Sequence, residues 1–115
     1  MKKEKSEFWA ETLEHITATW QKKKGRKYPP FTGKELNMLK QIMGWLTAAE
    51  TMALWSTYLV NSPFWGPKTG FSIVGLFSEK LTLIDDPNFK TLVRKFETEL
   101  GLKEVKQVAL ELGLK

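Results

Sequence analysis

The stretch TGKELNMLKQIMGWLTAAETMALW, residues 32–55, contains two helix starts of the same type and decides the fold. In TGKE at residues 32–35, and again in TAAE at residues 47–50, a Thr precedes a Glu by three positions. This is the spacing of a capping box, in which the Thr hydroxyl and the Glu carboxylate each accept a hydrogen bond from a backbone N–H group. Two such starts close together predict two consecutive helices with a tight connection near residues 44–47.

Helical spacing continues on both sides of this stretch. Upstream, apolar residues at intervals of three and four predict a helix from about Ser6 to the Lys-rich segment: Trp9, Leu13, Ile16 and Trp20. Downstream, Asp86 followed by Pro87 predicts another helix start, because Asp is a favoured N-cap and Pro is favoured at the first helical position. The apolar face of this helix is expected to consist of Phe89, Leu92, Val93, Phe96 and Leu100. The helix that begins at the second capping box, residues 47–50, is expected to face the core with Met52, Trp55 and Leu59.

The remaining segments complete an all-α prediction. Residues 61–70, NSPFWGPKTG, contain two Pro and two Gly and predict a long loop. Residues 71–81 could begin as a strand, but the helical spacing of Val74, Phe77 and Leu81 favours a helix. Gly101 predicts a helix end, so residues 102–115 are expected to form a short tail helix. We expect one domain, 1–115, with a disordered start (1–5), a basic and Pro-containing linker (22–31), and five or six short helices in an irregular orthogonal bundle.

The composition is that of a folded intracellular protein. The 115 residues are 42% hydrophobic and include five Trp and seven Phe, which is enough to bury a core. The absence of Cys excludes disulfides, thiolate metal sites and Cys nucleophiles. The basic start is not followed by an apolar run, and the most apolar stretch, residues 71–77, is much shorter than the roughly 20 residues of a membrane span. We therefore expect a soluble, cytoplasmic protein that does not contact membranes.

Residue patterns typical of catalysis are weak in this sequence. The single His, His15, lies on a helix flank beside Glu14, away from any nucleophile in the sequence, and is expected to be a solvated surface residue. Asp85 and Asp86 could hold Mg²⁺, but the N-cap role already explains Asp86. A phosphate loop of the GxxxxGKS type is also missing. We expect a non-enzymatic protein without a cofactor or a bound metal.

Positive charge is concentrated near the amino terminus. Residues 1–34 contain nine Lys or Arg and four Glu, whereas residues 35–115 contain nine basic and nine acidic residues, so the first third carries the whole net charge of +5. Such a segment attracts phosphate backbones. The candidate nucleic-acid-binding residues are Lys22, Lys23, Lys24, Arg26, Lys27, Tyr28 and Lys34, with Tyr28 stacking on a base and Lys34 acting at a helix start. The other interpretation is a solvated helix end followed by a charged loop.

An alternative function rests on the aromatic residues. Phe64 and Trp65 could anchor a protein partner, because Trp is enriched at binding hot spots, or they could fold onto the core beneath their loop. The other Trp residues are expected to be buried or half-buried: Trp9, Trp20, Trp45 and Trp55. The alternative is therefore a helical protein-interaction adaptor with no nucleic-acid role, able to assemble as a homo-oligomer.

A succession of packing and capping residues connects part of the chain to a known group of proteins. It runs through Tyr28-Pro29, Gly33-Lys34, Leu36, Leu39, Glu50, Trp55, Tyr58, Pro63-Phe64-Trp65, Gly70-Phe71-Ser72 and Leu76-Phe77. Residues 27–81 thereby resemble the small helical domain near the carboxy end of phage and prophage replication proteins of the initiator or replisome-organiser type. Glu35 departs from the pattern, which has Asp, but it keeps the cap intact. The resemblance implies a role at replication-origin DNA or with a helicase-loading replication protein, and it brings no active site.

Overall fold

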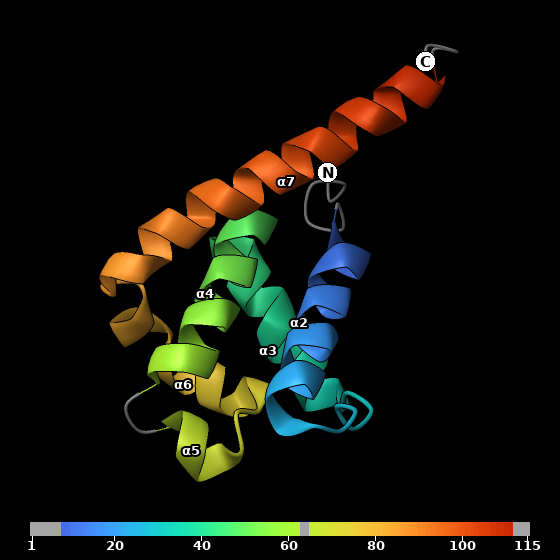
Figure 1. The fold of residues 1–115 in the computed structure, drawn as a ribbon. Helices are drawn as coiled ribbons and strands as arrows, with labels where there is room; N and C mark the ends of the chain where they lie inside the picture. Colours follow the sequence, from blue (N-terminus) through green and yellow to red (C-terminus); the bar gives the residue numbers. More distant parts are fainter. Residues whose placement is uncertain (1–7, 63–64, 112–115) are drawn as a thin grey trace.

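The computed structural model describes the backbone of residues 8–62 and 65–111, and the side chains of these residues except Trp65 and residues 102–111. Six helices follow one another in this part of the chain: α2 (Trp9–Lys24), α3 (Gly33–Trp45), α4 (Ala48–Asn61), α5 (Trp65–Thr69), α6 (Ile73–Leu83) and α7 (Pro87–Glu111). The described residues contain no strand (Figure 1). The all-α prediction is therefore confirmed, and so is the helical interpretation of residues 71–81.

Both predicted capping boxes form. Thr32 Oγ1 accepts from the backbone N–H of Glu35 at 3.1 Å, and Glu35 Oε1 accepts from the backbone N–H of Thr32 at 3.0 Å. The same pair of bonds joins Thr47 and Glu50, at 3.1 Å and 2.9 Å. Only Leu46 and Thr47 separate α3 from α4, so the connection between the two helices is tight, as the spacing predicts.

The central helix of the bundle is α4, which packs against α2, α3, α6 and α7 (Figure 1). Trp55 and Tyr58 are fully buried on it. The indole Nε1 of Trp55 donates to Thr19 Oγ1 on α2 at 2.9 Å, and the hydroxyl of Tyr58 donates to the carbonyl of Ser72 before α6 at 2.7 Å. Each aromatic side chain therefore contributes apolar burial, about 1.5–3 kcal/mol, and also fixes the position of a neighbouring element.

The prediction of a long loop at residues 61–70 is partly wrong, because α5 lies within these residues. The hydroxyl of Ser62 accepts from the backbone N–H of Gly66 at 2.7 Å and stabilises the first turn of this helix. Pro67 does not interrupt the helix, since Pro is tolerated in a first turn, where its missing N–H would have no partner. The helix ends at Thr69 and is followed by Gly70, which has the left-handed conformation with φ 70°.

The prediction of a separate tail helix at residues 102–115 is also wrong, because α7 continues through Gly101 to Glu111. A Gly inside a helix costs roughly 1 kcal/mol relative to Ala but does not end it. Gly101 is not among the described glycines with positive φ. The last part of α7 projects beyond the other helices (Figure 1). Residues 112–115 and the start predicted to be disordered, 1–5, lie outside the described residues. None of the described helices combines the length and apolar composition needed to cross a membrane.

One prediction of burial is wrong, and α6 buries another face than its helical spacing suggests. Trp45, expected to be buried or half-buried, is 47% exposed, since it is the last residue of α3 and lies at the edge of the packed region. Leu81, which has helical spacing with Val74 and Phe77, is 64% exposed. The buried apolar side chains of α6 are Ile73, Leu76 and Leu83, because α6 packs against α3, α4 and α5 and these contacts select another face of the helix.

Candidate nucleic-acid interface

The candidate interface begins at the last turn of α2. Lys22, Lys23 and Lys24 occupy this turn, where positive charge interacts favourably with the negative end of the helix dipole. Gly25 ends the helix in the left-handed conformation, with φ 77°, and its backbone N–H donates to the carbonyl of Gln21 at 2.8 Å. A residue without Cβ is favoured at this position, so the Gly directs the chain out of the helix.

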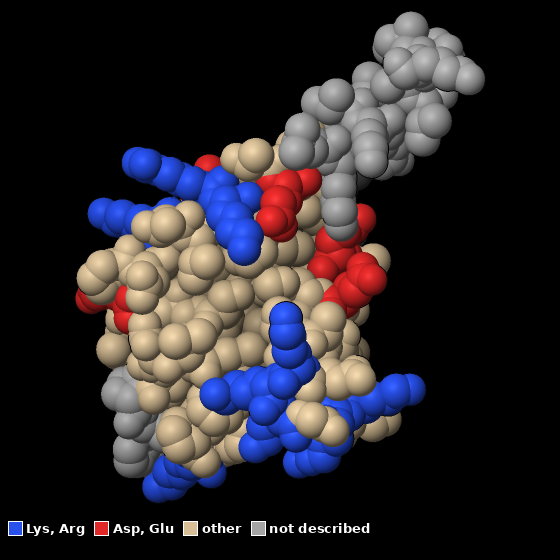
Figure 2. Space-filling view, in the orientation of Figure 1, with Lys and Arg blue, Asp and Glu red and all other residues tan. Residues whose placement is uncertain are grey.

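The basic segment consists of five cations on the two sides of this turn. All of them are exposed: Lys22, Lys23, Lys24, Arg26 and Lys27. Figure 2 shows Lys and Arg side chains gathered over the end of α2 and the segment that leads to α3. The sequence therefore places these charges together correctly, and the fold leaves them facing solvent.

Aromatic rings pack beside the basic segment and fix the backbone that carries it. Trp20 is only 3% exposed, and its Nε1 donates to the carbonyl of Gly70 at 3.3 Å. Its ring meets that of Tyr28 edge to face, with centroids 4.8 Å apart, and the Tyr28 ring lies 5.1 Å from that of Phe31. These contacts hold the segment after α2 against both α2 and the turn that precedes α6.

Three of the five cations lie over the rings of Trp20 and Phe71. Lys23 Nζ is 4.5 Å from the centroid of the Phe71 ring, and Arg26 Cζ is 5.0 Å from the ring of Trp20. Lys24 Nζ lies 6.0 Å from both rings. Cation–π contacts at such exposed sites contribute about 0.5–1 kcal/mol each. Within the described part of the chain, none of the five cations is paired with a carboxylate. The rings therefore position the side chains while their charges stay available to an anion.

Phe71 adopts a conformation that is rare for a large side chain. Its φ is 61°, in the left-handed region, which costs roughly 1–3 kcal/mol for a residue with a Cβ. The backbone N–H of Phe71 donates to the carbonyl of Gly66 at 2.7 Å, and the ring packs edge to face on Tyr58 at 5.7 Å. A Cβ on Gly66 would lie 2.6 Å from the Phe71 ring. The close packing of α5 therefore fixes the ring beneath Lys23.

The structure gives Tyr28 a different role from the base stacking that the sequence predicts. Its hydroxyl donates to Glu35 Oε2 at 2.7 Å and accepts from the backbone N–H of Ile73 at 3.2 Å. Burial, together with the hydrogen bond to Glu35, raises the pKa of Tyr28 above its ordinary value. Because both its hydroxyl and its ring are engaged within the fold, Tyr28 joins α2, α3 and α6, and its ring is not free to meet a base.

Lys34 is exposed in the first turn of α3. The hydrogen bond between Tyr28 and Glu35 holds this end of α3 beside the segment that follows α2. Backbone N–H groups at a helix start favour an anion, so Lys34 adds a cation beside the basic segment, and its contact with a phosphate stays a prediction.

A second group of cations, which the sequence analysis missed, lies on α7. The Lys and Arg of this helix whose side chains are described are all exposed: Lys90, Arg94 and Lys95. Figure 2 shows blue side chains over the beginning of α7, on the same face as the basic segment. The charge count could not reveal this group, since acidic residues elsewhere in 35–115 balance it. The four-residue spacing of Lys90 and Arg94, which places both on one side of a helix, is the signal that could have found it.

His15 is not the solvated surface residue that the sequence predicts. It is half-buried, with Nε2 3.0 Å from Ser56 Oγ on α4 and its ring edge against Phe96 on α7 at a centroid distance of 4.8 Å. Burial lowers the pKa of His15 below its ordinary value. His15 lies off the apolar stripe of α2, but α4 and α7 pack on that side as well, so it is a packing residue where three helices meet.

The fold also uses its acidic side chains. Asp86 caps α7 as predicted: Oδ1 accepts from the backbone N–H of Asn88 at 2.8 Å, while Oδ2 accepts from Asn61 Nδ2 at 3.1 Å. Glu79 is buried on α6 and accepts a short hydrogen bond from the hydroxyl of Ser62. Among the described residues, no three His, Asp or Glu side chains are grouped so that they could hold a metal ion.

The aromatic anchor of the adaptor hypothesis cannot be placed on this surface. Phe64 lies outside the described residues. Trp65 is the first residue of α5, and only its backbone is described. Their role in binding a partner stays a prediction.

No family model, curated protein or solved structure matches the chain. The resemblance of residues 27–81 to phage replication proteins therefore stays a prediction, and function has to be argued from the surface itself.

Proposed function

We propose that this protein is a non-enzymatic nucleic-acid-binding protein that contacts phosphates through Lys22–Lys27 and Lys34. The observation that carries the proposal is the arrangement of the basic segment: five exposed cations without carboxylate partners among the described residues, of which Lys23, Lys24 and Arg26 lie over the rings of Trp20 and Phe71. Phosphate backbones bind such groups by releasing condensed counterions, so affinity comes from the number of phosphates neutralised.

The ring contacts favour binding by restricting the cationic side chains beforehand. Ordering a free Lys or Arg side chain at an interface costs about 0.5–1.5 kcal/mol. Lys23 and Arg26, each held over a ring, have lost part of this freedom before the ligand arrives. Because phosphate contacts carry no sequence information, we expect binding with little preference for base sequence. The resemblance of residues 27–81 supports a role in phage-type replication complexes.

A protein-interaction adaptor is the second candidate function, and two exposed apolar side chains favour it. Trp45 is 47% exposed at the end of α3, and Leu81 is 64% exposed near the end of α6, the helix that packs on α3. Exposed Trp residues are frequent at binding hot spots. Replacing both with Ser should abolish capture of such a partner and leave nucleic-acid binding unchanged.

Fluorescence anisotropy with a labelled DNA duplex at low salt tests the first proposal. The wild type should bind, and the four-residue variant Lys23→Ala, Lys24→Ala, Arg26→Ala, Lys27→Ala should bind at least about tenfold more weakly, since it loses up to four phosphate contacts. Lys40→Glu on α3 is the control, because Lys40 is exposed and lies outside the basic segment and the first turn of α3. Absence of binding by the wild type, or equal affinity of the four-residue variant, would refute the proposal.

A further inference from the structure

The aromatic rings nearest the basic segment are engaged within the fold. Trp20 is buried, Tyr28 packs between Trp20 and Phe31, and Phe71 lies between Lys23 and Tyr58. Proteins that bind single strands stack successive bases on exposed aromatic faces, which supply about 1–3 kcal/mol per base. Among the described side chains, the basic segment therefore offers charge to a nucleic acid but no ring on which an unpaired base can stack.

The exposed Trp45 does not supply the missing stacking surface. It is the last residue of α3, whereas the basic segment lies beside the first. At 1.5 Å per residue the helix separates the two ends by roughly 18 Å. With the side chains that the structure describes, binding near the basic segment therefore relies on phosphates.

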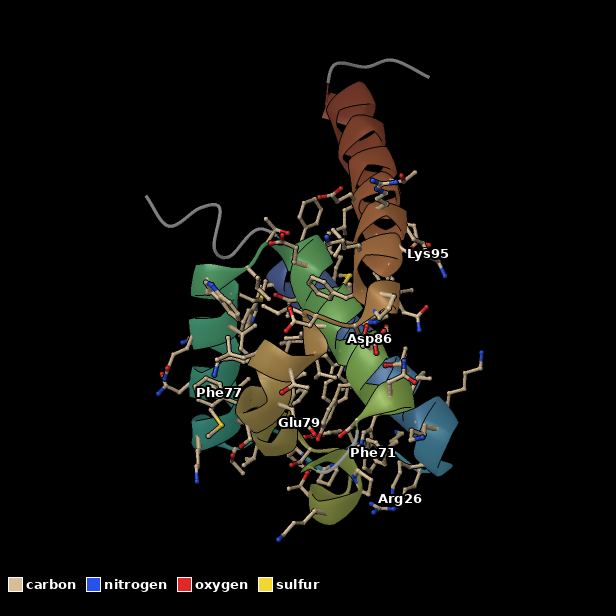
Figure 3. The ribbon with its side chains drawn as sticks, turned by 90° about the vertical axis from the view of Figure 1, so that its left-hand side faces the viewer. Arg26, Phe71, Phe77, Glu79, Asp86 and Lys95 are labelled. Atoms are coloured by element: carbon tan, nitrogen blue, oxygen red, sulfur yellow. The ribbon has the colours of Figure 1, made fainter. Side chains whose placement is uncertain are left out.

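The two groups of cations share one face of the molecule. In Figure 2 one group lies over the end of α2 and the other over the beginning of α7, with uncharged surface between them and carboxylates only at its edges. Figure 3, turned by 90°, agrees: Arg26 and Lys95 lie toward the same side, while Phe77 lies on the opposite side, next to α3. A ligand that contacts both groups has to cross the face between them.

We infer that the ligand is a double-stranded nucleic acid whose backbone contacts both groups, the basic segment and the α7 cations Lys90, Arg94 and Lys95. This inference rests on the proposed function and adds the form of the ligand and a second contact. A duplex carries its phosphates on a stiff rod, with stacked bases that need no aromatic platform. The two shorter extents of the molecule are 31 Å, about nine base pairs at 3.4 Å per pair, so a short duplex is as long as the molecule is wide.

The test compares ligands and variants by anisotropy at several salt concentrations. The ligands are a DNA duplex and an RNA duplex, each of about 20 base pairs, and the single strands that compose them. The α7 variant carries both Lys90→Ala and Arg94→Ala, which together lower the net charge by two. Lys40→Glu also lowers the net charge by two and is the control matched in charge. We expect at least one duplex to bind about tenfold more tightly than its single strands. We also expect the α7 variant to flatten the slope of log affinity against log salt by about two, and Lys40→Glu to leave it unchanged.

The outcomes distinguish failure of this inference from failure of the proposed function. Equal or tighter binding of single strands overturns the duplex assignment. A slope for the α7 variant equal to that of Lys40→Glu overturns the second contact. In both cases loss of affinity in the four-residue variant of the basic segment leaves the proposed function standing. Absence of all binding by the wild type removes the proposed function and the inference together.

Discussion

The ammonium group of Lys23 lies 4.5 Å from the centre of the Phe71 ring, joining the last turn of α2 to the residue before the N-cap of α6. The ring stays there because Phe71 holds a left-handed backbone conformation, braced by its hydrogen bond to Gly66 and its contact with Tyr58. A strained residue is kept in a fold when its surroundings determine it. Here the strain positions a ring under a cation of the proposed interface.

The first prediction concerns this ring. Phe71→Leu removes the cation–π contact without changing the charge, so duplex binding should weaken about two- to fivefold, the equivalent of about 0.5–1 kcal/mol. The salt slope should not change, because no phosphate contact is lost. Phe77→Leu is the matched control: it removes the ring that lies 3.8 Å from Lys80 Nζ on the other side of the bundle, and it should leave affinity unchanged. Equal affinities of a folded Phe71→Leu protein and the wild type would contradict the positioning role.

The second prediction concerns Gly66. A Cβ at this position would lie 2.6 Å from both the Phe71 ring and Ser62 Cβ, so Gly66→Ala should lower the free energy of unfolding by about 1–3 kcal/mol. Gly33→Ala is the control, because a Cβ on Gly33 meets nothing within 4 Å. It should be neutral or stabilising, since Ala favours a helix more than Gly does. Urea denaturation measures both, and a Gly66→Ala protein as stable as Gly33→Ala would show that α5 can yield.

The sequence predicts those features of the structure that depend on residues close together in the chain. Both capping boxes and the start of α7 at Asp86 are local patterns, and all three form as expected. Gly66 and Gly101 misled the prediction because Gly marks chain turns on average but does not prevent a helix when the surroundings favour one.

The contacts of the candidate interface depend on residues distant in the sequence. The basic segment is visible as a run of letters, but the ring beneath Lys23 comes from Phe71, and the bond that holds His15 comes from Ser56. Neither pairing has a local spacing, because each exists only once the helices have packed. The same reason hides the cations of α7, which join the interface only through the face they share with α2.

The third prediction concerns Thr57. Its hydroxyl is buried on α4 and has no hydrogen-bond partner within the described residues. A buried polar group without a partner is destabilising, so Thr57→Val, which keeps the shape, should raise the free energy of unfolding by about 1 kcal/mol. Thr51→Val is the comparison, since Thr51 Oγ1 donates to the carbonyl of Thr47 at 2.8 Å and should not give this gain. A destabilised Thr57→Val protein would indicate that the hydroxyl does have a partner.

The fourth prediction concerns pH. His15 is half-buried between Ser56 and Phe96, with Lys95 and Glu99 of α7 facing it, and burial lowers its pKa in the folded protein. Folding therefore favours neutral His15, so its contribution to stability is complete above the unfolded pKa of about 6.5 and decreases as the pH falls below it. Thermal unfolding between about pH 8 and pH 5 should show a larger decrease in Tm for the wild type than for His15→Gln, which cannot be protonated. Parallel curves would rule out this role of His15.

The central claim is that the basic segment neutralises phosphates, and the salt dependence of duplex binding tests it most directly. The slope of log affinity against log salt counts phosphate contacts at about 0.9 per contact. For the variant Lys23→Ala, Lys24→Ala, Arg26→Ala, Lys27→Ala, the account predicts a slope flatter than that of the wild type by about three to four. An unchanged slope in a folded variant would contradict it, because the phosphates would then be held elsewhere on the molecule.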